Sequence, residues 1–436
     1  MDPELPGYSP PAPTQPQASG SNARVGSQHS LSLEDSKGHK WLTLTVSSRA
    51  TDPASLPTFC QGDTISGHVD LDVLKSESIK GITIMVTAGT TFVGQEEQLF
   101  LKMEKELWTP SLPLPDGTKV SKFGKGNYSW PFELTLPNEV EVQDQNVKKD
   151  FHLPSTFSER ASAGYLDYKL IVTVKRGVLR VNQALTTVFS YVPLSRPDPP
   201  SRMVQKAYKE GLPLVGPEGD PDGWHVAPPV TIAGTIFDKR SVEVVCSLAF
   251  CRPLTYARGS AMPLWLTLTG DDEQALDLLS SPRSIRLLMV RSLATGSDAT
   301  AEDVERRTDN FFLETVARGV FWPPVDTVST GKRVLQGEVD VKRNLKPSTL
   351  FPNFTIRYHM ELQPFEAPGF VAVAPKNTLL KQKVTIVCFS APGIPMRSHA
   401  PPEYVQEQAA DYNKSVGLLE NGNQRFYHHG LSAGFP

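Results

Sequence analysis

The sequence predicts an all-β protein built from two tandem antiparallel β-sandwiches, with disordered tails at both ends. Apolar and polar residues alternate with a period of two in many short runs, which is typical of strands with one face on a core and one in water. These runs form two groups of similar length around a turn-rich stretch. We therefore expect one sandwich over residues 41–193, a linker over residues 194–228 and a second sandwich over residues 229–390.

The N-terminal segment, residues 1–40, is rich in proline, serine, glutamine and glycine and contains few large apolar side chains. Such a composition cannot bury enough apolar surface to offset the entropy of ordering, so we expect a disordered tail. The segment has no basic stretch followed by an apolar run, which argues against a secretory signal peptide. No apolar run along the chain reaches the length of a transmembrane helix.

The first group of alternating runs predicts the strands of the N-terminal sandwich. The runs lie at residues 42–46, 65–73, 82–86, 130–136 and 166–174. Within a run, residues of one parity share a face of the sheet. We therefore expect Trp130, Phe132, Leu134 and Tyr168 to point into the core.

The middle of the chain loses this alternation. Residues 195–200 and 216–223 are dominated by proline, glycine and aspartate, as in turns and linkers. Residues 203–210 are compatible with one or two helical turns. These features place the boundary between the two sandwiches within residues 194–228.

The second group of runs predicts the C-terminal sandwich. Strand-like runs lie at residues 242–248, 264–268, 285–290, 311–316, 335–341, 354–362 and 384–389. Asp271 is expected to cap a short helix that runs through Leu279 and ends before Pro282. Residues 391–436 are again rich in proline, glutamine and asparagine, and we expect them to be a disordered tail.

Composition excludes several classes of function. A formal net charge of -3 and a pI near 6.3 argue against nucleic-acid binding driven by global charge. Without an export signal, the four cysteines are expected to be free thiols in a reducing cytosol. The spacing of Cys246 and Cys251 places the two thiols on opposite faces of one strand, as core residues rather than a metal site. We find no phosphate-binding loop, nucleophile elbow or zinc-protease motif, so we expect no enzymatic activity and no cofactor.

A short motif near the C-terminus is the strongest functional signal in the chain. Pro401, Pro402 and Tyr404 form a Pro-Pro-x-Tyr sequence. Two adjacent prolines favour the extended polyproline II conformation, which WW domains bind in an aromatic-lined groove, with a neighbouring pocket for the tyrosine. Leu5, Pro6 and Tyr8 belong to a weaker variant, Leu-Pro-Gly-Tyr, and are a possible second WW-binding site.

Several segments of the first half resemble the arrestin N-terminal domain, in order and in spacing. They are Phe59 to Val69 with its Gly62-Asp63 step, Trp130 to Pro137, Leu153 to Phe157, and Gly164 to Leu170. In the second half the resemblance is carried by the strand pattern and by Asn353 to Tyr358. With the Pro-Pro-x-Tyr motif, the chain resembles an α-arrestin of fungal type. The resemblance implies the arrestin fold, two tandem immunoglobulin-like antiparallel β-sandwiches. The helical insert near residues 271–279 and the turn-rich linker depart from the family pattern.

The resemblance also implies a function and partners. The family's members are adaptors that link a HECT-type ubiquitin ligase with WW domains to cytosolic segments of membrane transporters or receptors, for ubiquitylation, endocytosis and sorting. We expect a cytoplasmic protein recruited to the plasma membrane or endosomes, and direct peripheral membrane association stays open. An alternative is a retromer-like trafficking scaffold that acts without a ligase and needs no Pro-Pro-x-Tyr motif. A secreted immunoglobulin-like adhesion module fits less well, because the Cys…Trp…Cys pattern is missing.

Overall fold

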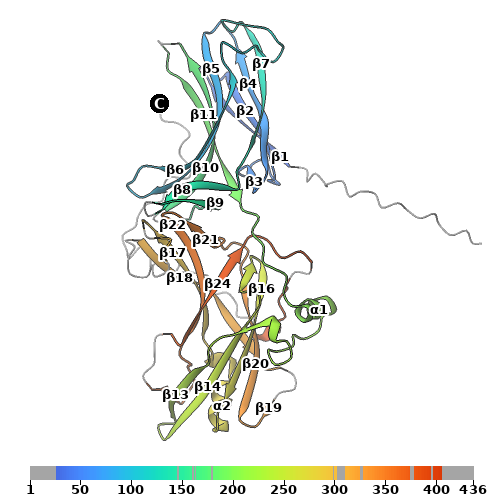
Figure 1. Ribbon diagram of the computed structural model, residues 1–436, viewed down its shortest axis with the longest axis vertical. Coiled ribbons are helices and arrows are strands. Elements are labelled where there is room, and N and C mark those ends of the chain that lie inside the picture. Colours follow the sequence, from blue (N-terminus) through green and yellow to red (C-terminus); the bar gives the residue numbers. More distant parts are fainter. Residues whose placement is uncertain are drawn as a thin grey trace, which may run out of the picture.

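The structure is a computed structural model that describes residues 26–144, 147–159, 162, 164–177, 180–297, 299–301, 310–324, 328–373, 378–393 and 396–404. Over these ranges the chain is an all-β protein with two β-sandwich domains in an arrestin-like arrangement, as predicted (Figure 1). The two domains lie end to end along the long axis of the molecule (Figure 1). No helix in the described part of the chain is long and apolar enough to cross a bilayer.

The N-terminal domain packs a four-stranded sheet against a five-stranded sheet. The first sheet has the order β1 (Ser27–Glu34), β2 (Lys40–Ser48), β4 (Thr64–Val73) and β7 (Gly126–Thr135). The second has the order β3 (Thr58–Cys60), β11 (Gln183–Val192), β10 (Gly164–Arg176), β5 (Ile79–Phe92) and β6 (Gln98–Trp108). A separate hairpin consists of β8 (Glu139–Asp144) and β9 (Val147–His152). All pairs are antiparallel except β3 with β11.

The predicted core residues of this domain are confirmed. Trp130, Phe132, Leu134 and Tyr168 are all buried, and the alternate residues of β7 are exposed. The Tyr168 hydroxyl donates a hydrogen bond of 2.7 Å to the carbonyl oxygen of Pro154. This bond satisfies the polar end of a fully buried ring, so the tyrosine contributes core area without an orphaned hydroxyl.

The C-terminal domain is one long sheet folded over on itself. Its main path is β15 (Thr255–Ala257), β24 (Leu380–Val387), β22 (Phe354–Leu362), β17 (Leu287–Thr295), β18 (Asn310–Trp322), β20 (Lys332–Val341), β16 (Ser260–Thr269), β14 (Arg240–Cys251), β13 (Val230–Ile236) and β23 (Phe370–Ala372). Short strands β12 (Trp224–Val226), β19 (Val328–Ser329) and β21 (Thr349–Phe351) pair beside it. Strand β18 pairs with β17 and then, from Gly319, with β20, so it joins the two layers.

Two short helices lie outside the sheets. Helix α1 (Arg202–Glu210) begins after Ser201, whose hydroxyl accepts from the Val204 amide, and ends at Gly211 in the left-handed conformation. Helix α2 (Glu273–Leu279) is the predicted helix, but its cap is Asp272 rather than Asp271. The Asp272 carboxylate accepts from the Ala275 amide at 2.9 Å. A cap serves the amide three residues later, so the start of the helix fixes which of two neighbouring aspartates is used.

Aromatic rings pack where the two domains meet. Phe351 of β21 contacts Phe100 of β6 and Phe151 of β9, at centroid distances of 4.7 and 5.7 Å. Phe157 contacts Phe354 of β22 at 4.8 Å. The hydrophobic core therefore continues from one domain into the other.

Two expected boundaries are wrong. Residues 27–34, which we placed in the disordered tail, form edge strand β1, and residues 224–226, which we placed in the linker, form β12. Strand β1 pairs with β2 at the edge of the sheet; hydroxyls lie opposite each other on one side, as with Ser30 and Thr45 at 3.1 Å, and Leu33 packs against the core on the other. Serine and threonine hydroxyls opposite each other stabilise an antiparallel pair, and the alternation of Leu31 and Leu33 is the only apolar signal of this strand in the sequence.

Candidate functional site

The Pro-Pro-x-Tyr motif lies at the end of a segment that is bound to the C-terminal domain. Pro401, Pro402 and Tyr404 are in the described part of the chain, and Pro402–Tyr404 forms a single 3-10 turn. The Tyr404 amide donates to the Pro401 carbonyl at 2.9 Å. The weaker motif with Leu5, Pro6 and Tyr8 lies outside the described residues.

The turn corrects our expectation of an extended motif. Proline fixes φ near −65°, a value shared by polyproline II and 3-10 helix, so ψ decides between the two. Pro402 restricts Pro401 to an extended ψ, but no proline follows Pro402 or Glu403. Proline is also favoured at the first position of a helix. The same residues can therefore form the observed turn or the extended ligand by changing ψ at two positions.

Glu338 of β20 holds the segment that precedes the motif. Its side chain is buried, with 5 % exposure, and accepts a hydrogen bond from the Ser398 hydroxyl and one of 2.9 Å from the His399 amide. The Ser398 hydroxyl also accepts from the Ala400 amide at 3.3 Å. A buried carboxylate must have hydrogen-bond donors, and here donors come from residues sixty positions away in sequence.

Helix α1 supplies the second contact to this segment. The ring of Tyr208 meets the ring of His399 edge to face, with centroids 4.7 Å apart. Burial raises the pKa of the Tyr208 hydroxyl, and the nearby Cys251 and Glu338 raise it further. The phenol therefore stays neutral, which favours its packing against the imidazole. The helix from the interdomain linker and the C-terminal segment thus lie against the same face of the domain.

Beneath these contacts is a small second core on the outer face of the sheet. Val204 of α1, Trp224, Ala249 and Cys251 are its buried members, and Met396 packs against it. The Met396 carbonyl accepts from the Ala261 amide at 3.1 Å. The chain from Met396 to Ala400 is therefore fixed by main-chain and side-chain contacts, which corrects our expectation that the whole segment after residue 390 is disordered.

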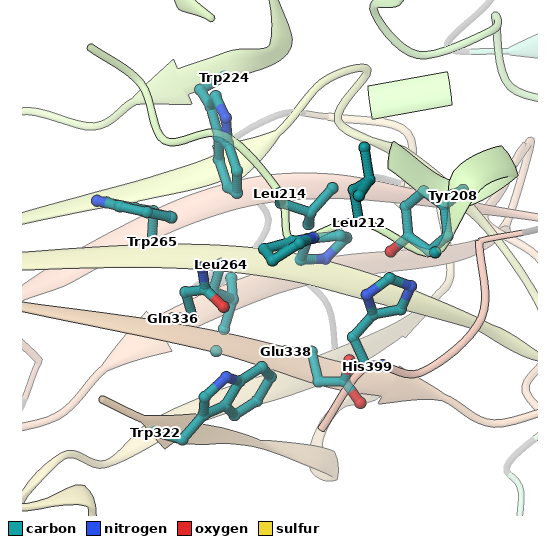
Figure 2. A pocket seen from close by; sticks show the side chains of 14 residues that line it. Tyr208, Leu212, Leu214, Trp224, Leu264, Trp265, Trp322, Gln336, Glu338 and His399 are labelled. Atoms are coloured by element: carbon teal, nitrogen blue, oxygen red, sulfur yellow. Dashed lines mark hydrogen bonds between the residues drawn. The ribbon is translucent and has the colours of Figure 1, made fainter. Parts of the chain in front are cut away.

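A cavity of about 210 Å³ opens beside this segment (Figure 2). Its lining includes three indole rings, of Trp224, Trp265 and Trp322, together with Glu338 and His399. Figure 2 shows Tyr208 and His399 side by side at one end of the cavity and Trp265 at the other. The strand register places Trp265 and Trp322 on either side of Gln336. The lining therefore combines aromatic rings with the polar side chains of Gln336, Glu338 and His399.

The other sequence candidates have structural roles. Cys246 lies in the main core and Cys251 in the second core on the opposite face, as predicted. Burial raises the pKa of each thiol to about 12, so neither is a thiolate near neutral pH. In the turn-rich stretch of residues 216–223, Asp220 accepts hydrogen bonds from Ser201 and from the Gly223 amide and so caps a turn, as the composition predicts. Within the described ranges, no three potential ligands are grouped as a metal site would require.

The acidic and aromatic partners of the motif segment were not predicted. Glu338 lies on the outer face of β20, where a period-two pattern predicts a solvated charge, and Tyr208 lies in a segment assigned to a linker. For Tyr208, the sequence signal was the spacing of Val204, Ala207 and Tyr208, which places these side chains on one side of a helix. No sequence signal identifies Glu338, because its burial depends on a distant segment.

Comparison with known proteins gives no family assignment, since no protein-family model matches the chain and no curated protein sequence matches it significantly. The class of the protein is therefore set by its fold: a two-domain β-sandwich protein with a Pro-Pro-x-Tyr segment on the surface of its second domain.

Proposed function

We propose that this chain is a non-enzymatic adaptor of the α-arrestin family, which brings a HECT-type ubiquitin ligase to membrane-protein cargo. The observation that carries the proposal is the Pro401-Pro402-Glu403-Tyr404 sequence at the surface of a two-sandwich scaffold. Pro402 and Glu403 are exposed and Tyr404 is half-buried, so a WW domain has direct access to most of the motif.

Docking of a WW domain requires the motif to open from the turn into the extended form. The change breaks one hydrogen bond, between Tyr404 and Pro401, and leaves the proline φ angles as they are. Tyr404 then places its ring in the apolar pocket of the WW domain, with its hydroxyl at the wet rim. The contacts of Glu338 with Ser398 and His399 hold the residues just before the motif and therefore oppose this opening.

The two sandwiches supply the rigid scaffold of this proposal. Packed sheets hold many surface loops in fixed positions, and such loops are where proteins place binding residues. Cytosolic segments of membrane transporters or receptors are the proposed cargo, at the plasma membrane or at endosomes. Ubiquitylation of the cargo by the recruited ligase then directs endocytosis and sorting.

Affinity capture from cells tests this function. The wild-type chain should retain a WW-domain ubiquitin ligase, and Tyr404→Ala should lose it while remaining folded. Tyr404→Phe is the matched control, because it keeps the ring and should keep most of the binding. Ubiquitylation of membrane proteins that bind the adaptor should fall with Tyr404→Ala. Equal capture of ligase by wild type and Tyr404→Ala would contradict the proposal and favour the ligase-free trafficking scaffold.

A further inference from the structure

Three loops meet at the end of the N-terminal domain that lies farthest from the C-terminal domain, beside the turn between β1 and β2 with Glu34 and Asp35 (Figure 1). They connect β4 to β5, β6 to β7, and β10 to β11. The strand register places their ends together, because Val73 is opposite Gly126, Ile79 is opposite Arg176, and Ile82 is opposite Trp108. We call the described residues 74–78, 109–125, 177 and 180–182 the distal tip.

The distal tip carries five cations, of Lys75, Lys119, Lys122, Lys125 and Arg180, and two carboxylates, of Glu77 and Asp116, so it is positively charged although the whole chain is negative. Lys75, Lys119, Lys122 and Lys125 are exposed, and none of the four forms an ion pair with another described residue. Arg180 forms an ion pair with Glu77, with a nitrogen–oxygen distance of 3.6 Å. Arg176, at the base of the tip, is 3.5 Å from the same carboxylate. The formal net charge of the chain is -3, so this concentration of cations is local.

Large apolar side chains project from the same loops. Val181 is 85 % exposed, Leu74 51 % and Leu112 42 %, and they come from three different loops. Single exposed apolar residues are ordinary on a protein surface. Three at one end of a domain, on the same loops as four exposed lysines, are a combination that suits a membrane interface: the apolar groups insert and the cations attract anionic headgroups.

Main-chain hydrogen bonds and aromatic packing fix two of these loops to the body of the domain. The amides and carbonyls of Glu77 and Phe123 exchange two hydrogen bonds of 2.9 Å, which join the first loop to the second. Phe123 is fully buried against Trp108 and Tyr128, with ring centroids 4.7 and 4.9 Å away. Lys122 and Lys125 flank Phe123, so their main chain is already ordered before they bind a partner, and binding does not cost this ordering entropy.

We propose that the distal tip is a docking surface for an anionic phospholipid membrane. The occupant is a bilayer because the tip lies at one end of the long axis of the described structure (Figure 1), with its cations spread over three loops. The proposal deepens the membrane side of the adaptor function. The opposite end of β6 contacts the C-terminal domain through Gln98 and Asn353, so the docked tip leaves the ligase motif facing away from the bilayer.

Vesicle sedimentation with the full chain tests the proposal. The protein should bind vesicles of phosphatidylcholine with phosphatidylserine, bind poorly to phosphatidylcholine alone, and dissociate as salt is raised. The triple variant Lys119→Gln, Lys122→Gln, Lys125→Gln should lower the partition coefficient by roughly tenfold to a hundredfold. The matched control changes three exposed lysines elsewhere, Lys102→Gln, Lys209→Gln and Lys239→Gln, and should bind like wild type.

A fluorescent label tests insertion of the tip directly. The four native cysteines are buried, so Val181→Cys can be labelled selectively with a polarity-sensitive dye. Its emission should shift to the blue with phosphatidylserine vesicles, while the same dye at Val371→Cys, on the C-terminal domain, should not respond. The proposal is overturned if the wild-type chain does not bind anionic vesicles or if both triple variants bind them equally well. It is also overturned if the emission of the dye at position 181 does not change with the vesicles.

The result can be separated from the ligase proposal. The tip lysines lie on the N-terminal domain, so the triple tip variant should bind a WW domain with the same affinity as wild type. Loss of vesicle binding with intact WW binding supports the docking surface, and intact vesicle binding with no WW binding would contradict only the ligase proposal.

Discussion

Arg291 of β17 forms a bidentate ion pair with Glu159 of the N-terminal domain. Its Nη1 and Nη2 atoms lie 2.8 and 2.7 Å from the two carboxylate oxygens, and Nη2 is also 2.7 Å from Glu314. Burial would lower the pKa of Arg291, but the hydrogen bond and charge of Glu159 outweigh it and raise the pKa above its usual range. The pair fixes the two sandwiches relative to each other beside the aromatic contacts.

We predict that Glu159→Gln destabilises the protein by about 1–3 kcal/mol, the usual contribution of charge-assisted hydrogen bonds. Arg291 keeps Glu314, so the buried cation is not left alone. Urea unfolding measures the change. The control is Glu141→Gln, which breaks an exposed pair with Lys148 and should leave the midpoint unchanged. Equal midpoints for Glu159→Gln and wild type would mean that the pair does not join the domains.

The core of the N-terminal sandwich gives a second prediction. Trp130 is 4 % exposed and packs against Phe123 and Tyr128. Trp130→Ala should destabilise the domain by about 3–5 kcal/mol through lost burial and the cavity left behind. Glu133→Ala, on the outer face of the same strand, should cost little. A denaturation midpoint for Trp130→Ala equal to that of Glu133→Ala would contradict the assigned core face.

Asp63, in the Gly62-Asp63 step of the family resemblance, predicts a pH dependence of stability. Burial alone would raise the pKa of Asp63. Hydrogen bonds from Arg49, at 2.6 Å, and from the Cys60 amide, at 2.8 Å, lower the pKa by more than burial raises it, so the pKa in the folded state is below that in the unfolded state. The stabilisation is therefore complete above the unfolded pKa and is lost as the pH falls through the folded pKa.

Replacement by Asp63→Asn should remove this pH dependence. Wild type should lose more of its unfolding free energy than Asp63→Asn does between about pH 6 and about pH 3. Urea midpoints at both pH values measure the difference. Parallel losses in the two proteins would show that the Arg49–Asp63 pair does not contribute to folding.

The contacts of Glu338 predict that the intact chain binds a WW domain more weakly than an isolated peptide with the same motif. The bound segment reduces the fraction of chains with an open motif, and apparent affinity falls by that fraction. Glu338→Ala removes the acceptor for Ser398 and His399 and should strengthen WW binding of the full chain by roughly threefold to tenfold.

Gln336→Ala is the matched control for this change. It lies on the same strand and lines the same cavity, but it forms no hydrogen bond with the segment from Met396 to Tyr404 in the described structure. Its WW affinity should equal that of wild type. If Glu338→Ala remains folded and its affinity is also unchanged, the bound segment does not restrict the motif.

The sequence was sufficient for the fold where burial follows a local pattern. Strand β22 matches the predicted run over residues 354–362, because its alternate side chains are buried in the core. Strand β1 was missed because its apolar alternation is limited to Leu31 and Leu33 in an otherwise polar segment, and the turn at Pro402 was missed because proline fixes φ but not ψ. Glu338 depends on contacts sixty residues away, which no local pattern contains.

Titration of an isolated WW domain tests the central claim most directly. A peptide spanning Ser398 to Gln406 should bind the WW domain of a HECT-type ligase with saturable heat, and Tyr404→Ala in that peptide should abolish the heat. Phosphorylation of Tyr404 should abolish it as well, because a dianion is excluded from an apolar pocket. The absence of heat and of competition with millimolar wild-type peptide would contradict the adaptor account.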